Sequence, residues 1–158
     1  MTRYYGPRAW LGGRMRAAAV VETVGRIVET RWPTTEAERV GLFAEVGFVD
    51  VSGGDRQFTA LGGKGQWSTY DDQFLGFSLF LFEGEARPRY DELRRLLIER
   101  FGAPVEEWGP AERPAIAWNV RGLVMSMYCH SDQANCVQLG LEHAERLAAN
   151  DRRAGAGR

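Results

Sequence analysis

Apolar residues recur at three- and four-residue intervals over Ala17–Val28, a spacing that places them on one face of a helix. Trp32-Pro33 ends this predicted helix, because proline cannot continue the hydrogen-bond ladder. Thr35 and Glu38 form a capping-box pattern that predicts the start of a second helix. Gly47 follows its apolar residues and suits the left-handed position beyond a helix end.

The middle of the chain predicts strands followed by a third helix. The predicted strands are Phe48–Val51, a hairpin of Arg56–Leu61 with Gln66–Tyr70 across a turn at Gly62–Gly65, and Phe74–Phe82. Phe74–Phe82 is apolar at nearly every position, which predicts a central strand covered on both sides. The third helix is predicted from about Pro88 to Phe101.

The last third predicts a three-stranded meander whose register follows from alternation. With a two-residue turn at Arg121-Gly122, one apolar face requires the pairs Val120–Leu123, Trp118–Met125 and Ile116–Met127. The same reasoning sets Met127 opposite Leu139, Cys129 opposite Val137 and Met125 opposite Leu141. A final helix is predicted over Leu141–Asn150.

This order of elements predicts the α+β class. We expect a single domain at residues 15–150, with a largely antiparallel curved sheet of about six strands and helices packed mainly on one face. Residues 1–14 are predicted to be a flexible basic arm, and residues 151–158 a disordered basic tail.

Charge is distributed unevenly along the chain. The net charge is -1, but residues 1–16 carry +4 and residues 151–158 carry +2, which leaves -7 on residues 17–150. An acidic body favours a basic partner over nucleic acid, although Tyr4, Tyr5 and Trp10 in the arm leave a nucleic-acid hypothesis open. The chain has no apolar run of the roughly 20 residues that span a bilayer, and no signal peptide, so we expect a cytoplasmic protein without a membrane partner.

Cysteine and histidine gather at Cys129, His130, Cys136 and His143. Adjacent strand residues point to opposite faces, and no Cys-x-x-Cys pair is present, so no metal site is predicted. The register separates the two cysteines and sets His130 opposite Cys136, which leaves a thiol–imidazole pair as an alternative. Neither Ser78 nor the Gly62–Gly65 segment matches a nucleophile elbow or a phosphate loop. The sequence therefore predicts no catalytic residue, no cofactor and no enzyme.

Aromatic side chains next to carboxylates are typical of recognition surfaces. The candidate partner-binding residues are Trp67, Tyr70, Asp71, Asp72, Glu106, Glu107 and Trp108. In the alternative interpretation both tryptophans belong to the core and the acids are solvated residues at strand ends.

The segments Asp72–Phe82, Phe101–Pro104, Trp118-Asn119 and Val137–Gly140 resemble uncharacterised actinobacterial domains, some of which occur beside toxins as immunity proteins. The order of elements also resembles the small α/β chaperones of bacterial secretion systems. The resemblance covers about residues 17 to 150 and transfers no catalytic residue. It implies that the protein binds another protein.

The sequence therefore predicts a non-enzymatic protein-binding module, either an immunity protein that neutralises a basic toxin or a secretion-type chaperone for an effector, which could be a homodimer. Two alternatives stay open. One is a small enzyme or ligand-binding protein that uses the surface carboxylates or the His130/Cys136 pair, and the other is a structural domain.

Overall fold

The structure, a computed structural model, describes residues 10–11 and 14–156. The strands β1 (Trp10–Leu11) and β2 (Arg14–Met15) pair with each other ahead of the main body. The described helices are α2 (Ala17–Glu29), α3 (Glu36–Val46), α4 (Ala86–Phe101) and α5 (Ala144–Ala156). The strands of the main sheet are β3 (Val49–Asp50), β4 (Gln57–Ala60), β5 (Gly63–Tyr70), β6 (Gln73–Leu81), β7 (Glu106–Trp108), β8 (Ala115–Val120), β9 (Leu123–His130) and β10 (Cys136–His143).

These eight strands form one antiparallel sheet in the order β3-β4-β5-β6-β10-β9-β8-β7. Its two edge strands do not pair with each other, so the sheet is open. The predicted α+β class and single domain are confirmed, but the predicted count of about six strands is too low. The strand that the sequence did not reveal is β7, which has exposed residues only and therefore no alternating pattern.

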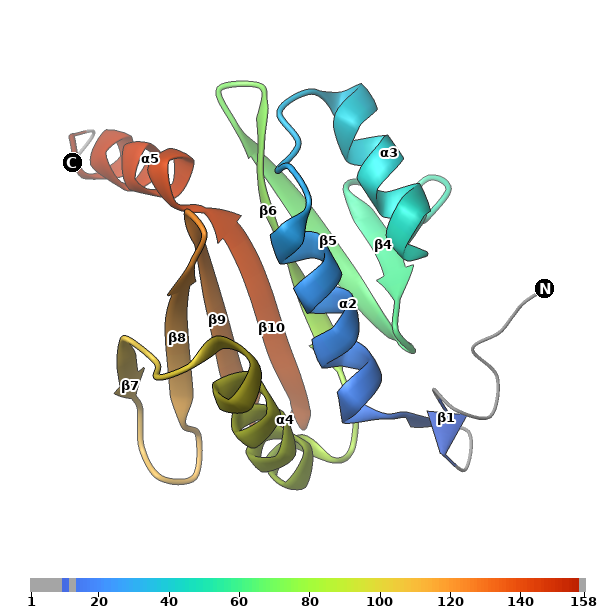
Figure 1. Cartoon of the computed structure of the whole chain (residues 1–158), viewed down its shortest axis with the longest axis vertical. Coiled ribbons are helices and arrows are strands. Elements are labelled where there is room, and N and C mark those ends of the chain that lie inside the picture. Colours follow the sequence, from blue (N-terminus) through green and yellow to red (C-terminus); the bar gives the residue numbers. More distant parts are fainter. Residues whose placement is uncertain (1–9, 12–13, 157–158) are drawn as a thin grey trace.

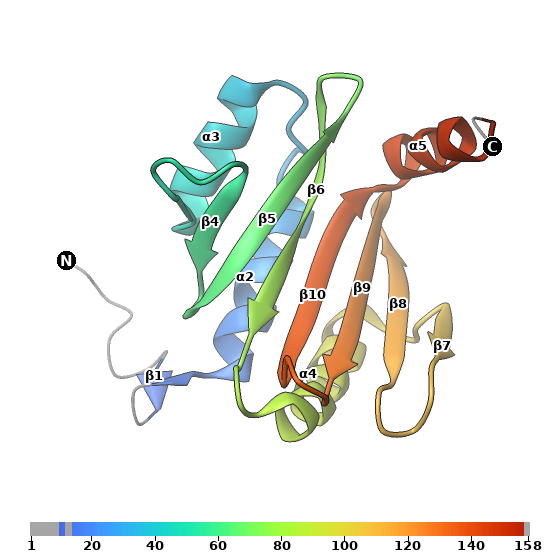
Figure 2. The ribbon, with the colours of Figure 1, turned by 180° about the vertical axis from the view of Figure 1, so that it is seen from behind.

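Helices α2, α3 and α4 lie on the same side of the sheet (Figure 1). Seen from behind, the strands from β4 to β8 carry no helix across them, and α5 extends from the end of β10 (Figure 2). The core lies between the sheet and α2, α3 and α4. Its largest fully buried side chains include Trp118, Tyr90, Phe43, Phe58 and Phe74. We call the uncovered side of the sheet the open face.

The predicted helix ends and register are largely confirmed. Thr35 caps α3 through its side chain, Glu38 completes the capping box, and Gly47 adopts a left-handed conformation with φ 83°. Strands β8, β9 and β10 pair in the predicted register, including Trp118 opposite Met125 and Cys129 opposite Val137. Alternation set this register, because slipping by one residue would move every apolar side chain to the open face.

Five predictions need correction. Helix α4 begins at Ala86 rather than near Pro88. The last helix starts at Ala144 and continues to Ala156, so the residues from 151 to 156 are helical rather than a disordered tail. The predicted turn at Gly62–Gly65 is a two-residue turn at Leu61-Gly62, and β5 already begins at Gly63. Strand β6 is central, but helices cover only one of its faces. The predicted arm at residues 1–14 falls mostly on residues outside those described.

Candidate functional site

The open face has a continuous row of side chains that crosses every strand of the main sheet. Consecutive partners in register define it, and we call it the cross-sheet row. Its members are Trp108, Ala115, Tyr128, Gln138, Phe80, Lys64, Thr59 and Val49, in sheet order. Because side chains alternate along each strand, all eight point away from the core.

Aromatic rings form the β7–β9 end of this face. The ring of Trp108 meets the ring of Tyr128 edge-on, with their centroids 5.8 Å apart. Tyr128 in turn stacks on His130, with centroids 6.1 Å apart and an interplanar angle of 16°. Trp108 remains 39% exposed. This end of the open face therefore offers apolar contact area to a partner.

Polar side chains continue the surface towards the centre of the sheet. A nitrogen of the His130 ring lies 2.7 Å from the Gln138 side-chain oxygen, and the Gln138 amide nitrogen donates to the Ser78 hydroxyl at 3.4 Å. These contacts order the amide of Gln138 between two neighbouring strands. Preordered side chains lose less conformational entropy when a partner binds.

Beside Ser78 the open face is hollowed. The hollow has a volume of about 220 Å³, and its lining residues are Gln66, Trp67, Ser68, Phe77, Ser78, Phe80, Gln138 and Glu142. Two register partners of the lining residues have no side chain, because Gly140 on β10 pairs with Ser78 and Gly76 on β6 pairs with Glu142. At Gly76 a Cβ would lie only 2.7 Å from the Cα and Cγ atoms of Glu142, so the Glu142 side chain lies across this glycine.

The Glu142 side chain makes no hydrogen bond or ion pair with any residue that the structure describes. Desolvation raises the pKa of its carboxyl above the ordinary value, and the negative charge of Asp151 on α5 raises it further. The hollow thus contains a carboxylate in a poorly hydrated position with a second acid nearby. Such a position attracts a cation.

The candidate residues predicted from the sequence fall into two separate groups. Trp67, Tyr70, Asp71 and Asp72 belong to the β5–β6 hairpin, whereas Glu106, Glu107 and Trp108 form β7. Strands β6, β10, β9 and β8 separate the two groups in the sheet. The structure therefore does not bring the seven residues together on one surface.

Within the hairpin group, Trp67 and Tyr70 have structural contacts, whereas Asp71 and Asp72 belong to the turn. Asp71 and Asp72 form the turn, with left-handed φ angles of 53° and 62°. The guanidinium of Arg153 on α5 lies 4.8 Å from the centre of the Tyr70 ring. Trp67 is half-buried and packs against the core. The alternative interpretation, with tryptophans in the core, describes Trp67 better than Trp108.

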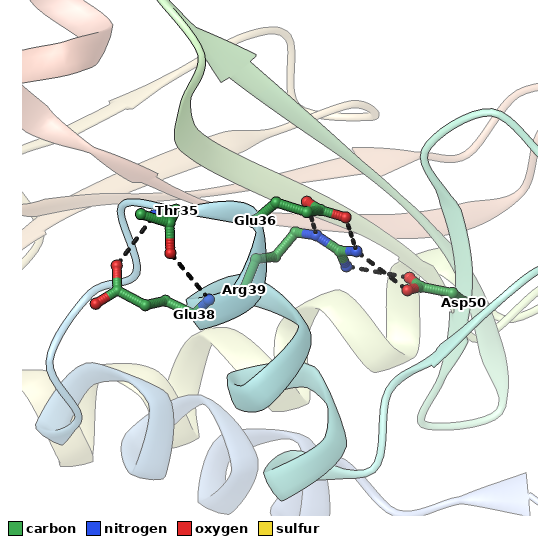
Figure 3. Close-up of polar contacts among 5 residues, drawn as sticks. All are labelled: Thr35, Glu36, Glu38, Arg39 and Asp50. Carbon is green, nitrogen blue, oxygen red and sulfur yellow. Dashed lines mark hydrogen bonds and ion pairs between the residues drawn. The ribbon is translucent and has the colours of Figure 1, made fainter.

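A buried arginine on α3 lies between Glu36 and Asp50 (Figure 3). Arg39 on α3 is 2% exposed, and its guanidinium lies 4.1 Å from the centre of the Trp67 ring. It donates to Glu36 at 2.9 Å and to both carboxylate oxygens of Asp50 at 3.1 Å. The hydrogen bond with Arg39 lowers the pKa of Glu36. This arrangement fastens α3 to the edge strand β3.

In the β7 group, the two glutamates face opposite sides. Glu107 accepts two hydrogen bonds from Arg94 on α4, at 2.8 and 2.9 Å, and this contact lowers the pKa of Glu107. Glu106 pairs with Ala117 and lies on the open face with Trp108. Of the seven candidates, Glu106 and Trp108 therefore belong to the open face together.

The predicted opposition of His130 and Cys136 is confirmed. Burial raises the pKa of the Cys136 thiol, and the charges of Glu83 and Asp132 raise it further, which disfavours a thiolate. Cys129 lies in the core on the other side of the sheet, and both cysteines are free. Among the described residues, no three histidine, cysteine or acidic side chains gather as metal ligands do.

Comparisons with known proteins identify no family. A scan against protein-family models and a search of curated proteins both give no match. Among solved structures, the crystal structure of a DUF4309 family protein (YjgB) from Bacillus subtilis is similar with a TM-score of 0.43 and 14% sequence identity. The similarity covers 77% of this chain and 97% of that one. No helix within the described residues combines the length and the apolar character needed to cross a membrane.

Proposed function

We propose that this chain is a non-enzymatic protein-binding module whose partner docks face-on against the open face of the sheet. The observation that carries the proposal is the cross-sheet row, in which Trp108, Tyr128 and Phe80 stand among small and polar side chains. Interfaces between proteins concentrate tryptophan and tyrosine at their centres. Serine, glycine and amide side chains around such anchors supply adaptable hydrogen bonds.

The distribution of the helices supports the same surface. Helices α2, α3 and α4 take up the apolar side of the sheet, so the side chains of the open face remain available. The edge strands β3 and β7 have only two and three residues, which limits docking by strand addition. A partner of the open face would therefore contact side chains more than backbone.

The charge of residues 17–150 supports a basic partner. With -7 on this part of the chain, electrostatic steering would speed the encounter with a positively charged protein. The most specific form of the proposal is that the chain neutralises a basic toxin. A secretion-type chaperone that holds an effector is the second form, and both forms use the same face.

The test is site-specific photo-crosslinking in the source cell. A photoreactive residue at Ser126 samples the open face, and one at Arg95 on the exposed side of α4 is the matched control. We expect the open-face position alone to capture one defined protein. Combining Trp108→Ala with Tyr128→Ala should weaken that complex about thirtyfold or more.

Three results would contradict the proposal. The first is equal capture from the control position, and the second is capture that survives the double substitution unchanged. The third is cross-linking to a second copy of this chain, which would assign the open face to a homodimer.

A further inference from the structure

The strongest unexplained feature of the molecule is the carboxylate of Glu142 in the hollow beside Ser78. Several charged side chains of the main body form ion pairs, as Arg39, Arg89 and Arg94 do. Glu142 instead has a second acid, Asp151, as its charged neighbour. Such an unpaired, partly buried charge lowers the stability of the folded protein, and destabilising groups of this kind concentrate at functional sites.

The shape of the hollow narrows the choice of ligand. Gly140 and Gly76, the register partners of Ser78 and Glu142, add no side chains beside it, and Gly140 could accept a Cβ only at 3.3 Å from the Phe77 carbonyl oxygen. Its lining includes the side chains of Gln66 and Ser78 and the ring of Phe80, together with Gln138, whose amide nitrogen donates to Ser78 while its oxygen contacts His130. The site thus combines hydrogen-bond acceptors, an aromatic ring and a negative charge.

We propose that the Glu142 hollow receives an arginine side chain of the protein partner. A guanidinium is planar, carries five donors and stacks on aromatic rings, so it suits the Glu142 carboxylate, the Ser78 hydroxyl and the Gln66 amide beside a phenyl ring. The ammonium group of lysine is more strongly hydrated and would use fewer of these acceptors. This inference rests on the proposed function, because it names the residue with which the partner anchors itself to the open face.

The negative charge of Asp151 on α5 disfavours the ionised form of Glu142 in the free protein, and an arriving guanidinium would offset that repulsion. Charge-assisted hydrogen bonds to a carboxylate are stronger than neutral ones. The hollow therefore carries a negative charge that suits a basic side chain before the partner binds.

The test is an NMR titration of the full chain with N-acetyl-arginine methylamide as the probe. We expect saturable shifts at the side chains of Gln66, Gln138 and Glu142, with a dissociation constant of about 10 mM, as is ordinary for so small a ligand. The neutral citrulline counterpart should produce no saturable shift. Glu142→Gln should weaken binding about tenfold, whereas Glu22→Gln on the exposed side of α2 should leave it unchanged.

Several outcomes would overturn the inference. They are equal binding of the citrulline compound, tighter binding of N-acetyl-lysine methylamide, unchanged binding to the Glu142→Gln variant, and no saturation of the hollow below about 50 mM. The test is independent of the proposed function. If Ser126 cross-links a partner but Glu142→Gln leaves that complex intact, the open face is an interface and only the arginine anchor is wrong.

Discussion

The guanidinium of Arg39 lies between its two acidic partners and the face of Trp67, 4.1 Å from the centre of the ring. Glu36 holds it from one side within α3, and Asp50 holds it from the edge strand β3. One side chain therefore joins a helix, an edge strand and the central hairpin. Arg39 also lies 4.6 Å from the centre of the Phe43 ring, which belongs to the core.

We expect Arg39→Lys to lower the free energy of unfolding by about 2 kcal/mol, because lysine cannot form two forked ion pairs and stack on a ring at once. Urea denaturation measures the change. Arg95→Lys is the control, since Arg95 forms an exposed pair with Glu99, and should cost less than about 0.5 kcal/mol. Equal stabilities for the two variants would show that the stacked geometry contributes nothing.

Tyr90 gives a second prediction. It lies on the buried side of α4, where it is 1% exposed, and its hydroxyl has no hydrogen-bond partner in the described structure. Burial raises the pKa of this phenol, so the hydroxyl stays neutral. Because an unpaired buried hydroxyl costs free energy, Tyr90→Phe should preserve stability or raise it by about 1 kcal/mol.

Thermal and urea denaturation of Tyr90→Phe would check this expectation, with Tyr90→Ala as the packing control. The alanine variant should lose about 3 kcal/mol or more, since it leaves a cavity under the helix. A clear loss of stability in the phenylalanine variant would mean that the hydroxyl has a partner after all.

Gly63 gives a third prediction. A Cβ at this position would collide with the carbonyl oxygen of Phe80 on β6 and lie 3.1 Å from Leu81. Gly63→Ala should therefore destabilise the protein by about 2 kcal/mol, by pushing two paired strands apart. A Cβ on Gly41 of α3 would have no atom within 4 Å, so Gly41→Ala should raise stability by about 0.5 kcal/mol or more. Opposite signs in urea denaturation would support this account.

The pH dependence of stability tests the electrostatics of Glu142. Its folded-state pKa is raised above the ordinary value of 4.5, so the folded chain holds this proton more tightly than the unfolded chain. The contribution of Glu142 to stability is therefore fully present below pH 4.5 and is lost as pH rises through the folded-state pKa. Glu142→Gln removes this loss.

We expect the Glu142→Gln variant to gain stability relative to the native chain as the pH is raised from about 4 to 7. Denaturation midpoints of the two proteins, measured at several pH values, give the difference. His143 and Arg146 also lie near the start of α5, but they are the same in both proteins and cancel. A difference that stays constant with pH would contradict the raised pKa.

Alternation in the sequence predicted the C-terminal meander well. Met125, Met127 and Cys129 alternate with polar or half-exposed residues, so only one register could bury them. The same signal was absent from Glu106–Trp108, because an edge strand with no buried side chain has no alternating pattern. The glycine-rich Gly63–Gly65 segment suggested a turn, although its glycines are required by close contacts within the sheet.

The candidate site was harder to predict from the sequence. Residues that are close along the chain suggested one group, whereas the site joins residues that lie opposite each other on neighbouring strands. The cross-sheet row joins Val49 to Trp108 through six intervening strands, and no local pattern contains this order. Part of the row could be predicted from the sequence, because the correct register of β8 to β10 already aligned Ala115, Tyr128 and Gln138. The order of the remaining strands, and the side that the helices cover, depend on long-range packing.

No loop separates β10 from α5, since β10 ends at His143 and the helix begins at Ala144. Arg146 ties the first turn of α5 to the carbonyl oxygens of Pro33 and Phe74, and the charge of Asp151 further along the helix raises the pKa of Glu142. Helix α5 therefore continues directly from β10, the strand that carries Glu142 of the hollow. A fluorescent label near the end of α5 would act as a remote reporter of occupancy, without obstructing the surface that it monitors.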